Sequence, residues 1–407
     1  MPYHGALQTT VSWAPLEPTN YHLAVCAYLE QREPELWNWI AASRQEQDPA
    51  LRLHLLKTTY QLSQEAHPAL HAAVAQASQR LNIAPEVALY QANHAEQINV
   101  AIYVENNAAH IIFSGAVLEL LDDAELSAVI GHELAHYELW QRDGGRFWIA
   151  SRLVERLADE EPGRGEWHYT ALRYQQYMEI YADRGAYRVC QDIAPCIASL
   201  VKIQTGLKQV HVDSYLEQAE RILAHDGVVS DAVSHPQAFI RAKALAMHAA
   251  AAPELDATLD RLLAGAMEPD TLDITGQVAL AALTRSVVAS LLTSPWFASD
   301  AVKALARRYW DDFTPGEAAA PQHLGAVGQV LLPDAHKLDT YLSFVLLDFA
   351  CVDPTLEELP MAAALQLADQ LGIGDTFETT VLKETRLKKT APAKLRAMVI
   401  PTHIDRP

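Results

Sequence analysis

The chain has 407 residues, with 31 basic and 51 acidic side chains and a formal net charge of −20. This charge argues against nonspecific binding to nucleic acid or to an anionic membrane, because both require a basic surface on the protein. Half of the residues are hydrophobic, and the length suffices for two or three domains with sizeable cores.

The first part of the chain is predicted to be helical. One helical pattern covers residues 20–47 and is interrupted at Pro34, and a second covers residues 51–81 with a break at Pro68. The residues of the first stretch that we expect in a core are Trp37, Trp39 and Ile40.

A β-hairpin is predicted next. Residues 98–104, INVAIYV, alternate in the manner of a strand, and residues 105–108 have the composition of a turn. Residues 110–115, HIIFSG, follow as the hairpin partner. This segment is the clearest source of β-structure in the sequence.

Residues 121–140, LDDAELSAVIGHELAHYELW, are predicted to form one amphipathic helix. Asp122 can cap its amino terminus, and Glu125, three residues later, completes a capping box. The glycine-rich stretch 143–145 then supplies the stop.

Two histidines of this helix form a candidate metal site. His132 and His136 lie one turn apart on one face, so both imidazoles can reach one ion, and Glu133 is offset so that it can face a water on that ion. In a chain with 17 histidines, an HExxH string arises by chance with a probability of roughly one in twenty. The prediction of a metal site therefore depends on the helix in which the string lies. Two nitrogen ligands suit Zn²⁺, and a catalytic zinc needs a third protein ligand and an open position.

The third ligand is expected from a later helix. An amphipathic helix is predicted over residues 147–161, and a second strongly helical run covers residues 167–191. On the second run Glu179 and Asp183 are four residues apart, so Glu179 can coordinate the metal while Asp183 accepts the N–H of a ligating imidazole. The alternative for such a pair is a solvated helix face, but neighbouring alanines and tyrosines favour burial.

Three ordered motifs, HELAH, EIYADRGA and SHPQAFIR, together resemble the gluzincin zinc metalloendopeptidases that include HtpX and the CAAX prenyl endoproteases. The resemblance covers roughly residues 65 to 248 and implies a zincin-like catalytic domain with a small β-hairpin or sheet. It implies the zinc ligands His132, His136 and Glu179, the general base Glu133, and a later His235-Pro236 and Arg241 close to the site.

The resemblance has two departures. The family's usual Asn-Ala segment appears here as Asn99-Val100 without the accompanying glycine, which leaves the register of the edge strand open. Membrane relatives have apolar spans around the catalytic helices, whereas residues 147–161 carry six charges after Ile149. The chain therefore looks like a soluble branch of the family.

The carboxy-terminal part carries no chemical motif. From about residue 255 the sequence is rich in Ala and Leu in helical patterns, and residues 311–325 read as a linker. Residues 342–375 faintly resemble TerB-like helical modules. We predict an N-terminal helical segment over 1–60, a zinc metallopeptidase domain over 61–252 and a helical C-terminal region over 253–407, with a sub-boundary near 311–332.

The protein is predicted to be soluble and cytoplasmic. Its two most apolar stretches are interrupted by Arg285 and Asp348, so no membrane span is expected. The first twenty residues lack the basic and apolar regions of a signal peptide. The four cysteines are too few and too scattered for a disulfide framework, so free thiols are expected.

The expected fold is α+β and mostly helical, and the expected function is zinc-dependent peptide hydrolysis with one Zn²⁺ per chain. Zinc lowers the pKa of its water to about 7, and Glu133 takes the proton from that water and passes it to the leaving amine. His235 is the candidate for stabilising the oxyanion, with Arg241 either assisting or bracing the site. The protein or peptide substrate would lie along the edge of the hairpin.

A second interpretation is a non-catalytic, zinc-stabilised regulatory or protein-interaction module. The large helical C-terminal region is its main support, since this region is a candidate for binding a protein partner. The presence of Glu133 argues against it, because a purely structural metal site has no use for that carboxylate.

Overall fold

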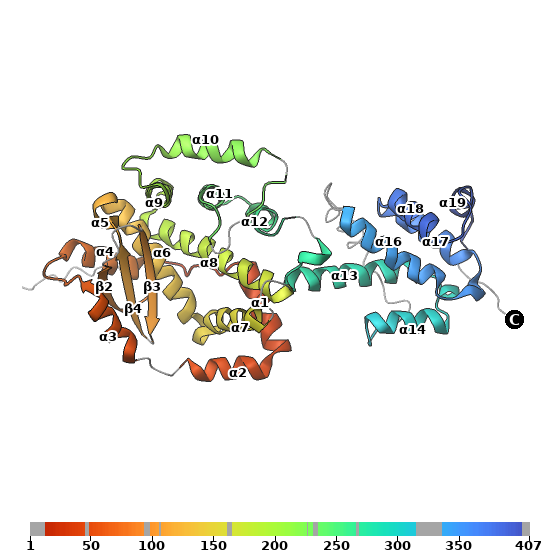
Figure 1. Cartoon of the computed structure of the whole chain (residues 1–407), viewed down its shortest axis with the longest axis horizontal. Coiled ribbons are helices and arrows are strands. Elements are labelled where there is room, and N and C mark those ends of the chain that lie inside the picture. The colour runs from red at the N-terminus through yellow and green to blue at the C-terminus, as the bar shows by residue number, and fades with distance from the viewer. Residues whose placement is uncertain are drawn as a thin grey trace, which may run out of the picture. The chain divides into compact units, whose positions relative to one another are not determined.

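A computed structural model of the chain describes these residues: 13–44, 49–92, 98–105, 107–160, 165–225, 227–230, 235–265, 268–314 and 336–400. They belong to two units, one up to residue 265 and one from residue 268, each with its own internal contacts (Figure 1). The structure confirms the predicted class, a mostly helical α+β fold with one small sheet.

The first unit begins with four helices, three of which start at a proline. Pro34 is the first residue of α2, and Pro68 is the first residue of α4. Proline is favoured at this position because a backbone N–H there would have no hydrogen-bond partner within the helix. Their bounds are α1 (Asn20–Arg32), α2 (Pro34–Ser43), α3 (Pro49–Thr58) and α4 (Pro68–Arg80). Both predicted interruptions are therefore confirmed.

Two strands were not anticipated. Thr59–Gln61 forms β1, so the prediction of one helical stretch from residue 51 to Pro68 is wrong at this point. Its partner, β2 (Glu86–Ala92), lies in a part of the sequence for which no strand was expected. Strand β1 is stabilised by pairing with a strand about thirty residues away in the sequence. The β-branched and aromatic residues of β1 suit a strand, but a local pattern does not reveal this distant partner.

Of the three residues expected in the core of the first helices, one is buried. Ile40 is buried and Trp37 is half-buried, but Trp39 is 54% exposed and the prediction for it is wrong. The guanidinium of Arg156 lies 4.9 Å from the centre of the Trp39 ring, a cation–π contact that accounts for an aromatic side chain on the surface.

The sheet has four strands in the order β1-β2-β4-β3. The predicted hairpin is confirmed: β3 (Asn99–Glu105) pairs antiparallel with β4 (Ala108–Ser114). Strand β4 is the buried inner strand and pairs with β2 in parallel on its other side. Strand β3 is therefore left at the edge of the sheet, with one side of its backbone unpaired by any strand of the described residues (Figure 1).

The helix that carries the two histidines is α6 (Asp123–Gln141), preceded by the short α5 (Val117–Leu120). The predicted capping box is confirmed, since Asp122 accepts from the backbone of Ala124 and Glu125, and Glu125 accepts from the backbone of Asp122. The short helix η1 (Arg142–Gly145) follows, and Asp143 and Gly144 have positive φ there, which ends the regular α6 backbone.

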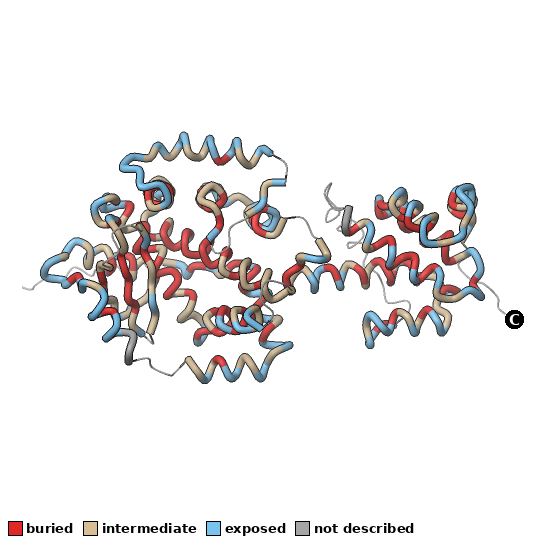
Figure 2. The backbone as a smooth tube through the Cα atoms, in the orientation of Figure 1, coloured by how far each residue is buried: buried red, intermediate tan, exposed pale blue. Residues whose placement is uncertain are grey.

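Helices α7 (Arg146–Glu160) and α8 (Glu166–Cys190) follow, and α8 packs against α6. Small residues permit a close approach: a Cβ added to Gly185 would lie 2.2 Å from the Cβ of Ala135, and one added to Gly131 would lie 2.8 Å from Val189. This contact brings the acidic residues of α8 next to the histidines of α6. Figure 2 shows buried residues concentrated along these two helices.

We expect Gly185→Ala to push α6 and α8 apart. The added methyl has no room, so the substitution should lower the free energy of unfolding by about 1 to 3 kcal/mol and weaken zinc binding. Gly144→Ala is the control, because a Cβ there meets nothing within 4 Å and only the backbone is strained. Urea denaturation and zinc titration against a chelating dye measure both effects. Equal zinc affinity in wild type and Gly185→Ala would contradict the close-packing account.

Four further helices complete the first unit: α9 (Ile193–Thr205), α10 (Val212–Leu223), α11 (Ala238–Ala249) and α12 (Leu255–Ala264). Helix α9 is tied to the beginning of α6 by a buried ion pair between Lys202 and Glu125, with Nζ and Oε2 2.8 Å apart. Helix α12 packs on α8 and α11, although the predicted boundary at 252/253 assigns it to the C-terminal region. The helices before residue 60 also pack within this unit.

A buried histidine lies beside α8 in the core of the first unit. His22 is fully buried, its Nδ1 is 2.9 Å from the hydroxyl oxygen of Thr19, and aromatic rings surround it. The ring neighbours are Phe147, Tyr174, Tyr177 and Tyr181. Burial lowers the pKa of His22 to about 3.

This histidine is expected to make the first unit sensitive to acid. The unfolded imidazole takes up a proton near pH 6.5 while the folded one does not until about pH 3, so stability is complete above pH 6.5 and falls as the pH drops. Between pH 7 and pH 5 the loss should be about 2 kcal/mol. The variant His22→Phe keeps a ring in place and should show a smaller difference between urea unfolding at the two pH values. An unchanged difference would exclude His22 as the source.

The described residues of the second unit form helices and the segments that connect them, with no strand. Its core includes the fully buried rings of Phe297, Phe349 and Phe377. The elements are η2 (Pro269–Thr271), α13 (Ile274–Leu291), η3 (Pro295–Phe297), α14 (Asp300–Tyr309), α16 (His336–Cys351), η4 (Pro354–Leu356), α17 (Leu359–Gln370), α18 (Gly374–Glu384) and α19 (Ala391–Arg396). Most of the predicted linker and sub-boundary at 311–332 lies outside the described residues.

Helix α13 is long and apolar enough to cross a membrane by length and composition, although no span was predicted there. It carries Arg285, and it contributes Val287, Val288 and Leu291 to the core of the second unit. A core helix of a soluble protein passes the same test, so α13 is weak evidence for a membrane span.

Candidate metal centre

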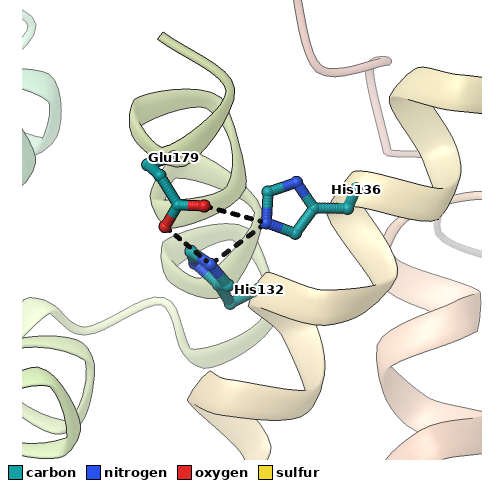
Figure 3. A group of neighbouring side chains, drawn as sticks. All are labelled: His132, His136 and Glu179. Carbon is teal, nitrogen blue, oxygen red and sulfur yellow. Dashed lines mark hydrogen bonds and ion pairs between the residues drawn. The ribbon is translucent and has the colours of Figure 1, made fainter. Parts of the chain in front are cut away.

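Three side chains from two helices converge on one point (Figure 3). The Nε2 atoms of His132 and His136 are 3.3 Å apart, and the two carboxylate oxygens of Glu179 lie 3.4 Å from His132 and 3.5 Å from His136. Ligands placed tetrahedrally at 2.0 to 2.1 Å from a zinc ion are separated by about 3.3 to 3.4 Å. The distance between the two imidazole nitrogens therefore fits one zinc ion, and one ligand atom from each of the three residues lies within 4.8 Å of the others.

The convergence follows from helix periodicity and close packing. His132 and His136 are one turn apart on α6, and Glu179 and Asp183 are one turn apart on the facing side of α8. Because Gly185 lets the two helices touch, short carboxylate side chains on α8 reach the imidazoles of α6.

Asp183 and Arg241 form hydrogen bonds and ion pairs with the proposed metal ligands. The Nδ1 of His132 lies 3.1 Å from Asp183 Oδ1, so the imidazole donates to the carboxylate and leaves Nε2 for a metal. Arg241, on α11, donates to both oxygens of Asp183 at 2.6 and 2.8 Å, and its Nη1 is 3.2 Å from Glu179 Oε2. The guanidinium of Arg241 therefore lies where it can fix the two carboxylates in place. This is one of the two roles considered for Arg241, the other being assistance to His235 at the oxyanion.

His235 stands at the open side of the cluster. Its Nδ1 is 3.0 Å from Glu179 Oε2, and its side chain is 64% exposed. All seven candidate residues are thereby brought into one neighbourhood. Their chemical roles stay predictions.

The electrostatics of the cluster favour a divalent cation. Burial raises the pKa of Glu133. Burial is the largest single influence on the pKa values of Glu179 and Asp183 and acts to raise them, but the Arg241 guanidinium and the hydrogen bonds from neighbouring histidines together outweigh it, and both pKa values are lowered. Metal binding requires the ligating imidazoles in their neutral form, and with all imidazoles neutral the three carboxylates and one guanidinium give a formal charge of −3 + 1 = −2, which the charge of one Zn²⁺ balances.

A cavity of about 700 Å³ opens over the metal centre. The edge strand contributes Asn99–Ile102 to its wall, and the segment 235–238 contributes another part. Trp140 also lines it and stacks on the ring of His136, with ring centres 5.6 Å apart. The part of β3 with an unpaired backbone side therefore lies beside the metal ligands.

Helix α9 is the part of the cavity that sequence reasoning did not anticipate. Five of its residues belong to the wall of the cavity: Cys196, Ser199, Leu200, Ile203 and Gln204. The available signal was local: Asp192 is an N-cap residue in front of a run of mostly apolar residues. Nothing in that run indicates that it faces the HELAH helix.

The comparison with protein families agrees with the class of site. Residues 64–147 match the model of Peptidase family M48. This segment contains the sheet strands β2 to β4 and α6 with His132, Glu133 and His136, and it ends before Glu179. The match supports a relationship to the M48 metallopeptidases.

A curated relative carries a name of the same class. The chain is 30% identical over 160 residues to the plastoglobule-localized metallopeptidase 48, chloroplastic, of Arabidopsis thaliana. The similar region covers 37% of this chain and 45% of the relative, so the chain spans less than half of that protein's length. No solved structure gives a significant match to the chain. The narrower resemblances to HtpX, the CAAX prenyl endoproteases and TerB-like modules stay predictions.

Proposed function

We propose that the protein is a zinc-dependent metalloendopeptidase. The observation that carries the proposal is the convergence of His132, His136 and Glu179, each of which offers one ligand atom within 4.8 Å of the other two. The similarity to metallopeptidases supports the same assignment.

Glu133 is the proposed general base. It is buried on the ligand helix, and within the described part of the chain no hydrogen bond or ion pair uses its carboxylate. A buried carboxylate without a structural partner costs stability, so its presence points to a chemical role. The raised pKa of Glu133 brings it closer to neutral pH, which suits a group that accepts and then returns a proton.

The other residues orient the reaction. Bound zinc supplies Lewis-acid activation of the attacking water and of the scissile carbonyl. Glu133 takes the proton of the water on its carboxylate and transfers it to the nitrogen of the leaving amine. The exposed imidazole of His235 faces the cavity and donates a hydrogen bond to the developing oxyanion. Asp183 keeps His132 in the tautomer with a free Nε2.

The substrate is proposed to be an extended segment of a protein or peptide. Residues 99–102 of the edge strand line the cavity, and their unpaired backbone groups can form main-chain hydrogen bonds with such a segment. This mode of binding fixes the scissile bond over the metal centre without requiring a particular sequence.

The proposal is tested with the purified full chain. Metal analysis should find one zinc per chain, and an unfolded protein substrate should be cut internally. A chelator should stop cleavage and added zinc should restore it. Zinc-loaded protein that cuts no unfolded substrate, but binds a protein partner only while zinc is present, would instead support the non-catalytic module.

A further inference from the structure

We propose that Cys190 and Cys196 are a redox-active pair whose thiols are converted to a disulfide by hydrogen peroxide. The two cysteines are six residues apart, at the junction of α8 and α9, and the proposed hydrolysis uses neither of them. The inference goes beyond the proposed function, because it assigns a site of oxidative modification that is separate from the metal ligands.

The turn between the two helices brings the cysteines together. Cys190 is the last residue of α8, Gln191 has a positive φ that ends this helix, and Asp192 caps the start of α9. Cys196 lies in the first turn of α9, where its thiol donates to the carbonyl of Asp192 at 3.4 Å. Both cysteine side chains pack in one apolar cluster, and their thiols are hydrogen-bonded to one another. A local rearrangement of such thiols brings the sulfurs to the S–S bond length of about 2.05 Å.

The two thiols differ in their access to a small oxidant. Cys190 is half-buried, and its Sγ lies 3.6 Å from the carbonyl oxygen of Ala124 at the start of α6. Cys196 belongs to the cavity wall, but it is only 2% exposed. Peroxide is therefore expected to react first with Cys190, which leaves Cys196 as the resolving thiol.

The surroundings of Cys190 favour its thiolate. The hydrogen bond from the Cys196 thiol is the largest influence on the pKa of Cys190 and lowers it. Arg80, which donates to the carbonyl of Val189, lowers the pKa further, while burial and the carboxylate of Asp192 oppose these effects. The net result is a pKa below the ordinary value of a cysteine, so Cys190 has more of the nucleophilic thiolate at neutral pH.

The oxidation takes place in two steps. In the first, the Cys190 thiolate attacks one oxygen of hydrogen peroxide and the O–O bond breaks. Cys190 becomes a sulfenic acid, and the leaving hydroxide takes up the proton that Cys190 released and forms water. In the second, the Cys196 sulfur attacks the sulfenic sulfur while its proton passes to the leaving oxygen, so that the S–S bond forms and a second water leaves. The two thiols thus lose two electrons and two protons, and one peroxide is reduced to two waters.

The disulfide would link two elements that surround the metal centre. Helix α8 carries Glu179, and Cys196 is part of the cavity wall that α9 contributes. Neither cysteine is among the three proposed metal ligands, so their thiols are free to react in the zinc-loaded protein. In a reducing compartment such a disulfide forms only transiently, as is usual for redox-sensing pairs.

The first test compares the rates at which iodoacetamide alkylates Cys190 and Cys351 in the folded full chain at neutral pH. Cys351 is exposed on α16, but partial desolvation of its thiol and the nearby Asp348 raise its pKa. We expect Cys190 to react at least about 10-fold faster, because the thiolate is the nucleophile. Faster alkylation of Cys351 would mean that exposure alone controls thiol reactivity, and would overturn the inference.

The second test is mass spectrometry after treatment with hydrogen peroxide and then with iodoacetamide. Trypsin cuts after Arg188 and Lys202, so one peptide contains both cysteines of the pair. In oxidised wild type this peptide should be lighter than the reduced peptide by two hydrogen atoms and should carry no alkyl group, while Cys351 is still alkylated. Reduction before alkylation should restore two alkylated cysteines. A peptide that is alkylated at both cysteines after peroxide treatment would contradict the proposal.

The variant Cys196→Ser removes the resolving thiol, so peroxide should convert Cys190 to a sulfenic acid that dimedone traps. We expect at least about 10-fold more of the dimedone adduct than in wild type, where the disulfide forms instead. Cys351→Ser is the matched control and should form the disulfide as wild type does. Should Cys196→Ser fail to fold, Cys190→Ser replaces the half-buried thiol and should leave Cys196 unoxidised. Equal adducts in Cys196→Ser and wild type, or an oxidised Cys196 in Cys190→Ser, would overturn the assignment.

Discussion

Replacing Glu133 by glutamine is expected to reduce peptide hydrolysis at least about 100-fold while leaving one zinc bound per chain. The amide keeps the size of the side chain but cannot accept the proton of the attacking water. Zinc should remain, because the three proposed ligands are His132, His136 and Glu179. Initial rates of cleavage of an unfolded protein measure the loss of hydrolysis, and metal analysis of the same enzyme sample measures the zinc content.

Glu119→Gln is the matched control, since Glu119 is an exposed glutamate on α5. Hydrolysis by wild type should also fall as the pH drops through the pKa of Glu133, which burial raises above the ordinary value of a glutamate. Equal rates in Glu133→Gln and wild type, with contaminating protease excluded, would remove Glu133 from the mechanism.

Arg241→Met is expected to destabilise the first unit by about 3 to 5 kcal/mol. The guanidinium is buried between Asp183 and Glu179, and methionine would leave both carboxylates without their cation. Because a zinc ion compensates Glu179 directly, the loss should be larger in zinc-free protein than in zinc-loaded protein. Urea unfolding with and without zinc measures the difference.

Lys243→Met supplies the control on the same helix. Lys243 pairs with Glu220 at 2.6 Å, but Glu220 is exposed, so the substitution should cost at most about 1 kcal/mol. Similar losses for Arg241→Met and Lys243→Met would mean that Arg241 is not the cation that stabilises the carboxylates of Asp183 and Glu179.

The local parts of the site could be predicted because their signals lie close together in the sequence. The capping box at Asp122 and Glu125 and the i, i+4 spacing of His132 and His136 depend only on one helix. The pairing of Glu179 with Asp183 on a later helix also follows from spacing, but its approach to the histidines required the resemblance to a known family.

The non-local parts could not be predicted. Strands β1 and β2 exist through their pairing, and the weak pattern of Thr59–Gln61 does not reveal a partner at Glu86–Ala92. The approach of α6 and α8 depends on Gly185 lying opposite Ala135, which no single-helix pattern contains. For the same reason α9 was not recognised as a wall of the cavity, and Trp39 was assigned to a core although it lies on the surface.

The unpaired edge of β3 has a consequence for which proteins could be cleaved. Only a segment in extended conformation can align with an edge strand, so a helix or an inner strand of a substrate would first have to open. When opening is fast, each 1.4 kcal/mol of local stability in the substrate lowers the cleavage rate about 10-fold. Damaged or unassembled chains would then be degraded ahead of their intact counterparts, with no recognition signal other than their own loss of structure.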